Sequence, residues 1–142
     1  MSLNTIQEEI VEEFSMFSDW LDKYDYLIEL GSELPAIDPE LKTDEYLING
    51  CQSKVWLNAE YQDGKVFYQA DSDAIIVRGI VALLVKAMNG QAPKDIIDND
   101  LFFIDKIGLK QNLSPTRSNG LVAMVKKMKL FALAYQVKDG NG

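Results

Sequence analysis

The first part of the chain carries apolar residues three or four positions apart, the spacing of one helix face. This pattern predicts an amphipathic helix from about Thr5 to Lys23. Thr5 and Glu8 have the spacing of a capping box, in which each side chain satisfies a free amide at the helix start. The predicted apolar face consists of Ile6, Ile10, Phe14, Phe17 and Leu21.

Helix-ending residues follow this first segment. A second, short helix is predicted from about residue 22 or 23 to Leu30, with Gly31 placed to end it. Pro35 prevents its continuation, so residues 32–44 are expected to form an extended connector.

Alternating apolar and polar residues mark the middle of the chain as a strand region. Residues 55–61 alternate, and residues 66–70 form the expected return strand. Asp63-Gly64 lies between them and favours a tight hairpin turn, because glycine readily adopts positive φ. Residues 46–49 are a candidate third strand that leads into the segment around Cys51.

Helical patterns return after the hairpin. Ser72 is expected to cap a long apolar helix over residues 73–89, with Gly90 as its stop. Shorter helical segments are predicted over residues 93–97 and 101–107. Ser114-Pro115 then begins a final helix that runs to about residue 136, and residues 139–142 are expected to be frayed. These elements predict one α+β domain over residues 1–142, with helices packed around a small antiparallel sheet.

Charge limits the classes of partner. The 142 residues include 14 Lys and Arg against 22 Asp and Glu, a net charge of -8. Nucleic-acid binding is disfavoured, because phosphate contacts need clustered cations and Lys126, Lys127 and Lys129 fit better on the wet face of a helix. No apolar stretch approaches the roughly 20 residues of a membrane span, and no secretory signal is recognisable, so we expect a cytoplasmic protein.

The chain has no histidine and one cysteine, Cys51. Zinc sites and iron–sulfur clusters normally need several Cys or His ligands, so we predict no metal site of these kinds. Carboxylate-bound Mg²⁺ or Ca²⁺ stays open, although no loop has the oxygen spacing of such a site. A Ser-His-Asp or Cys-His catalytic arrangement cannot be built without histidine.

The cysteine lies in the sequence Gly50-Cys51-Gln52-Ser53, which is typical of a loop because Gly50 permits a tight bend and Gln52 and Ser53 favour turns. One hypothesis is that Cys51 is a small buried residue, as most free cysteines are. The other is that it is a reactive thiol. Without a histidine, its thiolate would need backbone amides, a nearby cation or a partner protein for activation.

The chain resembles the SufE family from about residue 10 to residue 135. The matching segments are Tyr-Leu-Ile-Glu-Leu-Gly at 26–31, Leu-Pro at 34–35, Gly-Cys-Gln-Ser-Lys-Val-Trp-Leu at 50–57, Asp-Ser-Asp-Ala-Ile-Ile-Val-Arg-Gly at 71–79 and Leu-Ser-Pro-Thr-Arg-Ser-Asn-Gly-Leu at 113–121. The resemblance implies a SufE/IscU-like fold. It also implies that Cys51 is a persulfide acceptor.

The resemblance further implies a sulfur-transfer partner and not a self-contained enzyme. SufE proteins stimulate a cysteine desulfurase of the SufS or CsdA type, whose pyridoxal phosphate stays with that partner. They pass the sulfur to a SufBCD-type scaffold for iron–sulfur cluster assembly. Two other functions stay open, a cluster scaffold of the IscU kind and a plain interaction domain. The chain could be a monomer or a weak homodimer.

Further residues are candidates for supporting roles. Gly50, Gln52 and Ser53 flank the thiol, and Arg117 is a cation in the first turn of a helix, where the helix dipole disfavours it. Asp73 and Arg78 are candidates for a docking surface, although Asp73 equally suits a helix cap. Trp56 is expected to anchor the core, and Asn119-Gly120 would be explained by close packing against the Cys51 loop.

Overall fold

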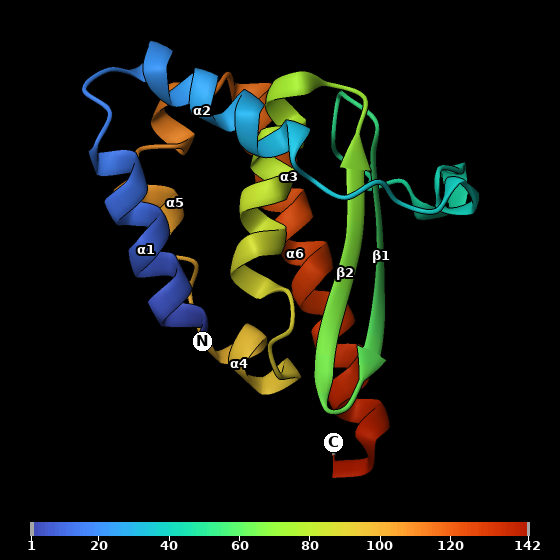
Figure 1. The fold of residues 1–142 in the computed structure, drawn as a ribbon. Coiled ribbons are helices and arrows are strands. Elements are labelled where there is room, and N and C mark those ends of the chain that lie inside the picture. The colour runs from blue at the N-terminus through green and yellow to red at the C-terminus, as the bar shows by residue number, and fades with distance from the viewer. Residues whose placement is uncertain (1, 142) are drawn as a thin grey trace.

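The computed structural model describes residues 2–141 and shows a β-hairpin with helices packed on one of its faces (Figure 1). α3 (Ile75–Met88) and α6 (Pro115–Gln136) lie next to the hairpin, and α1 (Leu3–Ser15) and α2 (Trp20–Ser32) lie farther out, beyond α3. The buried residues of the hairpin and the helices form one apolar cluster. The predicted α+β class is confirmed.

The boundary between the first two predicted helices was wrong, because α1 ends at Ser15 and α2 begins at Trp20. Residues 16–19 separate α1 from α2, because the Asp19 side chain accepts a hydrogen bond from the amide of Asp22 at 2.9 Å and starts a new helix. The predicted capping box was also wrong. Ser2 caps α1 by accepting from the amide of Thr5 at 3.1 Å, which places Thr5 inside the helix.

Gly31 does not end the second helix, because α2 continues to Ser32. It lies instead where α2 crosses α3, opposite Gly79. A Cβ atom on Gly31 would be 2.8 Å from the Gly79 nitrogen, and one on Gly79 would be 2.2 Å from the Leu27 carbonyl oxygen. The two glycines therefore let the helix backbones approach more closely than side chains would allow.

The connector after α2 crosses the hairpin and projects beyond it, with 3-10 turns at Pro39–Leu41 and Asp44–Tyr46 (Figure 1). The candidate third strand is reduced to one bridge, between Leu47 and Trp56, supported by a 2.9 Å hydrogen bond from the Ile48 amide to the Val55 carbonyl. The expectation for Trp56 was wrong, since it is only half-buried. Lys42 Nζ lies 5.5 Å from its ring centroid.

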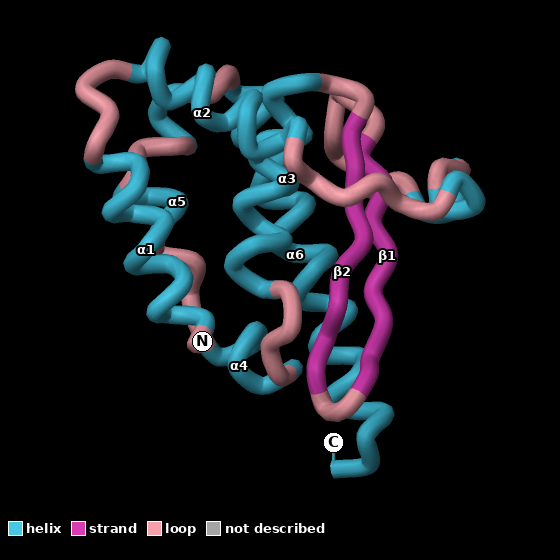
Figure 2. The backbone as a smooth tube through the Cα atoms, in the orientation of Figure 1, coloured by secondary structure: helices cyan, strands magenta, loops and turns pink. Residues whose placement is uncertain are grey.

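The hairpin consists of β1 (Val55–Gln62) and β2 (Lys65–Ser72), antiparallel and joined by Asp63-Gly64 (Figure 2). Both turn residues have positive φ, 54° and 78°, as the tight two-residue turn requires. The predicted hairpin is confirmed. Its alternate residues Val55, Leu57 and Ala59 are buried against the helices.

The remaining helices are α4 (Pro93–Asp98), α5 (Phe103–Lys106) and the long α6, which Ser114 caps as predicted. Ser72 does not cap α3 directly, because the N-cap position is Ala74. Residues 137–141, part of which we expected to be frayed, continue α6 as a π-helical turn, and residue 142 lies outside the described residues. Within residues 2–141, no helix combines the length and the apolar character that crossing a membrane demands.

Candidate functional site

The Cys51 loop lies between the Leu47 bridge and the start of β1. Gly50 turns the chain with a φ of 93°, a conformation that side-chain-bearing residues rarely adopt. A Cβ atom there would also lie 3.5 Å from the Cβ of Ala123 on α6. The loop is thus bent tightly against α6, and this bend presents Cys51 to the first turns of that helix.

Cys51 packs directly against Gly120. Its Sγ lies 3.7 Å from the Gly120 carbonyl oxygen, to which the thiol donates a weak hydrogen bond. A Cβ atom on Gly120 would lie 3.4 Å from Sγ. The close packing expected at Gly120 is therefore observed, whereas Asn119 is exposed and no contact in the structure explains it.

A small cavity of about 90 Å³ opens beside the sulfur. It joins three elements that are far apart in the sequence, and it contains four of the predicted site residues. Its walls are Cys51, Gln52 and Ser53 from the loop, Val77 and Ile80 from α3, and Thr116, Arg117, Gly120 and Met124 from α6. The lining combines polar side chains from the loop and the start of α6 with apolar side chains from α3 and α6.

The position of Cys51 in this cavity favours the protonated form of its thiol. Burial raises the pKa of Cys51 above its ordinary value, because a half-buried thiolate loses hydration. Arg117 lines the same cavity, is exposed, and forms no ion pair with any residue from 2 to 141. The cavity that Cys51 lines is therefore also bordered by a positive charge that no carboxylate within residues 2–141 pairs with.

Asp73 holds the base of the Cys51 loop and does not line the cavity. Its carboxylate accepts a hydrogen bond from the Lys54 amide at 3.0 Å. Its own amide donates to the Lys54 carbonyl oxygen at 3.2 Å, and the Ser72 hydroxyl donates to the same oxygen at 2.8 Å. Three hydrogen bonds thus fix Lys54, three residues after the cysteine, to the start of α3.

Arg78 is also outside the cavity and is engaged in an ion pair. Its Nε donates to Asp71 at 2.9 Å, and its guanidinium also donates to the Ser72 carbonyl. Lys42 contacts the other Asp71 oxygen at 3.0 Å. Burial alone would raise the pKa of Asp71, but the hydrogen bond from Lys42, the Ser72 amide and the Arg78 charge together lower it.

Several residues of the site were not among the predicted ones. Thr116 and Met124 line the cavity, Lys54 anchors the loop, and Asp71 links Lys42 to Arg78. Lys54, Asp71 and Thr116 lie inside the matching sequence segments, which was the available signal for them. Across residues 2–141, no group of three or more His, Cys, Asp and Glu side chains is arranged to hold a metal ion.

Comparison with known proteins gives the class of this chain. Residues 8–132 match the family described as "SufE: Fe-S metabolism associated domain". An uncharacterised SufE-like protein of Synechocystis is 38% identical over 133 residues, covering 94% of this chain and 84% of that protein. A SufE-like protein of Rhizobium etli is 41% identical over 127 residues, covering 86% of each. The protein is therefore of the class associated with iron–sulfur metabolism.

The chain belongs to the SufE family. A longer relative, "SufE-like protein 1, chloroplastic/mitochondrial" of Arabidopsis thaliana, is 39% identical over 132 residues, 92% of this chain but 36% of that protein. The fold also matches the solution structure of a hypothetical protein from Thermus thermophilus, with a TM-score of 0.77 at 20% identity. That likeness covers 93% of this chain and 96% of the other.

Proposed function

We propose that this protein is a sulfur acceptor that takes sulfur onto Cys51 from a pyridoxal-phosphate-dependent cysteine desulfurase. In this proposal it stimulates that enzyme and passes the sulfur to a SufBCD-type scaffold. Membership of the SufE family supports a role in sulfur transfer. The observation that carries the proposal is the position of the single cysteine, Cys51, on a bent loop beside a small cavity.

The transfer step needs one nucleophile and one leaving group. The Cys51 thiolate attacks the outer sulfur of the donor's cysteine persulfide, so a new S–S bond forms on Cys51 and the donor's S–S bond breaks. The donor leaves as a thiolate, which takes up a proton, while Cys51 has given one up. No net oxidation or reduction occurs, so no further reagent is required.

Because the pKa of Cys51 is raised, the thiol has to lose its proton before it can attack. At rest the thiol is neutral and half-buried, and a neutral thiol is a poor nucleophile. The proposed consequence is that the donor must move the loop or supply a proton acceptor before transfer. An acceptor of this kind resists unspecific oxidation while it waits for its partner.

The residues around Cys51 receive proposed roles from their contacts. Arg117 would attract the negatively charged persulfide, and Gln52 and Ser53, which line the same cavity, would offer hydrogen-bond donors. Asp73 is proposed as a positioning residue, because it acts through Lys54 and not on the sulfur. Arg78 is proposed to stabilise this region through its ion pair with Asp71.

Purified protein, a cognate cysteine desulfurase and L-cysteine test the proposal. We expect the chain to gain the mass of one sulfur atom, and sulfide release by the desulfurase to rise. The Cys51→Ser variant should show neither change. A sulfur gain that survives this substitution, or a wild-type protein that gains no sulfur, would contradict the proposal.

A further inference from the structure

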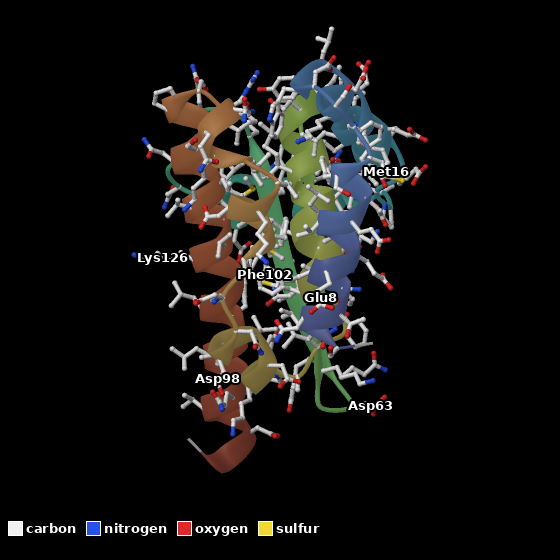
Figure 3. All side chains as sticks on the ribbon, turned by 90° about the vertical axis from the view of Figure 1, so that its left-hand side faces the viewer. Glu8, Met16, Asp63, Asp98, Phe102 and Lys126 are labelled. Carbon is white, nitrogen blue, oxygen red and sulfur yellow. The ribbon has the colours of Figure 1, made fainter. Side chains whose placement is uncertain are left out.

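The outer face of α6 exposes an apolar stripe that no other part of residues 2–141 covers. Val122, Leu130 and Leu133 are 50%, 49% and 45% exposed, and their spacing places them along one side of the helix. Lys126 lies between them and points away from the molecule, on the side remote from Met16 (Figure 3). Apolar side chains and a cation thus share one exposed surface.

A groove runs between this helix face and the segment that leads to Cys51. We call it the α6 groove, and its volume is about 310 Å³. Its walls include Leu47 and Asn49 on one side, and Ala123, Lys126, Lys127 and Leu130 on the other. Lys126 also borders a second hollow on the other side of the helix, together with Val122. A partner placed on α6 would therefore meet lysine and apolar side chains on both flanks, with one carboxylate, Asp100, in the second hollow.

The C-terminal part of the chain, which includes α6, differs in charge from the N-terminal part. Residues 106–138 contain seven Lys and Arg and no Asp or Glu, whereas residues 1–46 contain thirteen Asp and Glu and two Lys. Lys127 lies over the ring of Phe131 at 5.3 Å, and Lys129 donates to the Asn99 carbonyl at 3.0 Å. Lys126 has no such contact with residues 2–141, so its charge is available to a partner.

The α6 groove is continuous with the proposed transfer site. Asn49 in its wall is followed directly by Gly50 and Cys51, and Gly50 packs against Ala123 in the opposite wall. A sulfur donor must bring its own persulfide to Cys51. A donor that does so comes within reach of this groove, because the same short loop forms both.

We infer that the α6 groove docks an acidic segment of the desulfurase, one that inserts an apolar side chain beside Leu130 and places carboxylates on Lys126 and Lys127. This inference rests on the proposed function. A symmetric contact with a second copy is disfavoured, because it would bring the lysines of the two α6 helices together. Nucleic acid is disfavoured by the exposed Val122, Leu130 and Leu133.

The test compares two variants in the groove with two matched controls elsewhere. Lys126→Glu is matched by Lys65→Glu at the hairpin turn, at the other end of the hairpin from the Cys51 loop (Figure 1). Leu130→Asp is matched by Leu21→Asp on α2, where Leu21 is 74% exposed. All four positions lie on the surface, and thermal unfolding checks that each variant is folded.

Binding to the purified cognate desulfurase is measured at two salt concentrations, together with the dependence of sulfur transfer on acceptor concentration. We expect each groove variant to weaken binding about tenfold, since hot-spot and charge-complementary contacts have effects of this size. The controls should stay within about twofold of wild type, the range expected of surface changes outside an interface. The maximal transfer rate should stay unchanged, because Cys51 and its cavity are intact, and the Lys126→Glu effect should shrink at high salt.

Equal binding by groove and control variants would overturn the inference while wild-type sulfur transfer still supported the proposed function. Absence of both desulfurase binding and sulfur gain in the wild type would instead contradict the proposed function itself. Two further outcomes would also overturn the inference. In the first, the wild type binds phosphatidylserine vesicles and the groove variants do not. In the second, the wild type forms a concentration-dependent dimer and the groove variants do not. In both, the affinity of the groove variants for the desulfurase equals that of the wild type.

Discussion

Gly120→Ala is expected to raise stability and lower sulfur transfer at the same time. Gly120 lies within α6, where alanine is favoured over glycine by about 1 kcal/mol. The added Cβ would lie 3.4 Å from Cys51 Sγ and 3.8 Å from its Cα, which is ordinary contact and needs little displacement. The net effect on the free energy of unfolding is therefore a gain of up to about 1 kcal/mol.

In the proposed transfer, the same methyl group would occupy space that the second sulfur atom on Cys51 needs. The cavity beside Cys51 has only about 90 Å³, and Gly120 forms part of its wall. Transfer to the variant should therefore slow by about tenfold or more, which corresponds to roughly 1.4 kcal/mol in the transition state. Thermal unfolding followed by circular dichroism measures the stability, with an expected rise of roughly 3 °C for a chain of this size.

A matched pair of variants separates the two effects. In the Cys51→Ser background the contact with sulfur is lost, so Gly120→Ala should stabilise that protein by the same amount or slightly more. The reasoning would be refuted if Gly120→Ala stabilised the protein and transferred sulfur at the wild-type rate. If Gly120→Ala instead lowered the free energy of unfolding by more than about 1 kcal/mol, the Cys51 loop would be packed more tightly against α6 than the 3.4 Å contact indicates.

Other changes test the fold and the resting state of the thiol. Gly79→Ala should lower the free energy of unfolding by about 3 kcal/mol or more, because its Cβ would be 2.2 Å from the Leu27 carbonyl oxygen. A denaturant titration measures this change, and an unchanged midpoint would contradict the close crossing of α2 and α3. Asp73→Ala removes the acceptor of the Lys54 amide, so the free energy of unfolding should fall by about 1–3 kcal/mol. Iodoacetamide should then label Cys51 faster, and an unchanged labelling rate would argue against a positioning role for Asp73. Labelling of wild-type Cys51 should increase with pH through a pKa above that of an unfolded thiol, and a pKa below it would refute the effect of burial. The sign for stability follows, since a raised pKa in the folded state stabilises the protein fully below the unfolded pKa and this contribution is lost as pH rises through the folded pKa.

Local signals in the sequence were sufficient for some elements and misleading for others. The hairpin turn at Asp63-Gly64 and the cap at Ser114 were predicted correctly, because both depend on neighbouring residues alone. The first helix was predicted too long. The apolar spacing continues through residues 16–19, but the cap at Asp19 begins a new helix there.

Errors also arose where a distant part of the chain decides the conformation. Gly31 has the usual properties of a helix stop, yet its role depends on Gly79 in another helix. Residues 46–49 have strand character, but only one bridge to β1 forms, because the 3-10 turn at Asp44–Tyr46 directly precedes it. Trp56 lies on the hairpin face opposite the helices, and the alternation of strand residues alone does not say which face is buried.

The sequence by itself determined the family, the single thiol and the bend that presents it, because these depend on residue identities over a few adjacent positions. Only the tertiary structure decided what Cys51 faces. Gly120, 69 positions later, and Arg117 reach the cysteine because α6 packs beside the hairpin. The same packing buries the thiol, which raises its pKa, and joins the α6 groove to the Cys51 loop. Both features depend on the tertiary structure, since solvent exposure and neighbouring charges are properties of the packed chain.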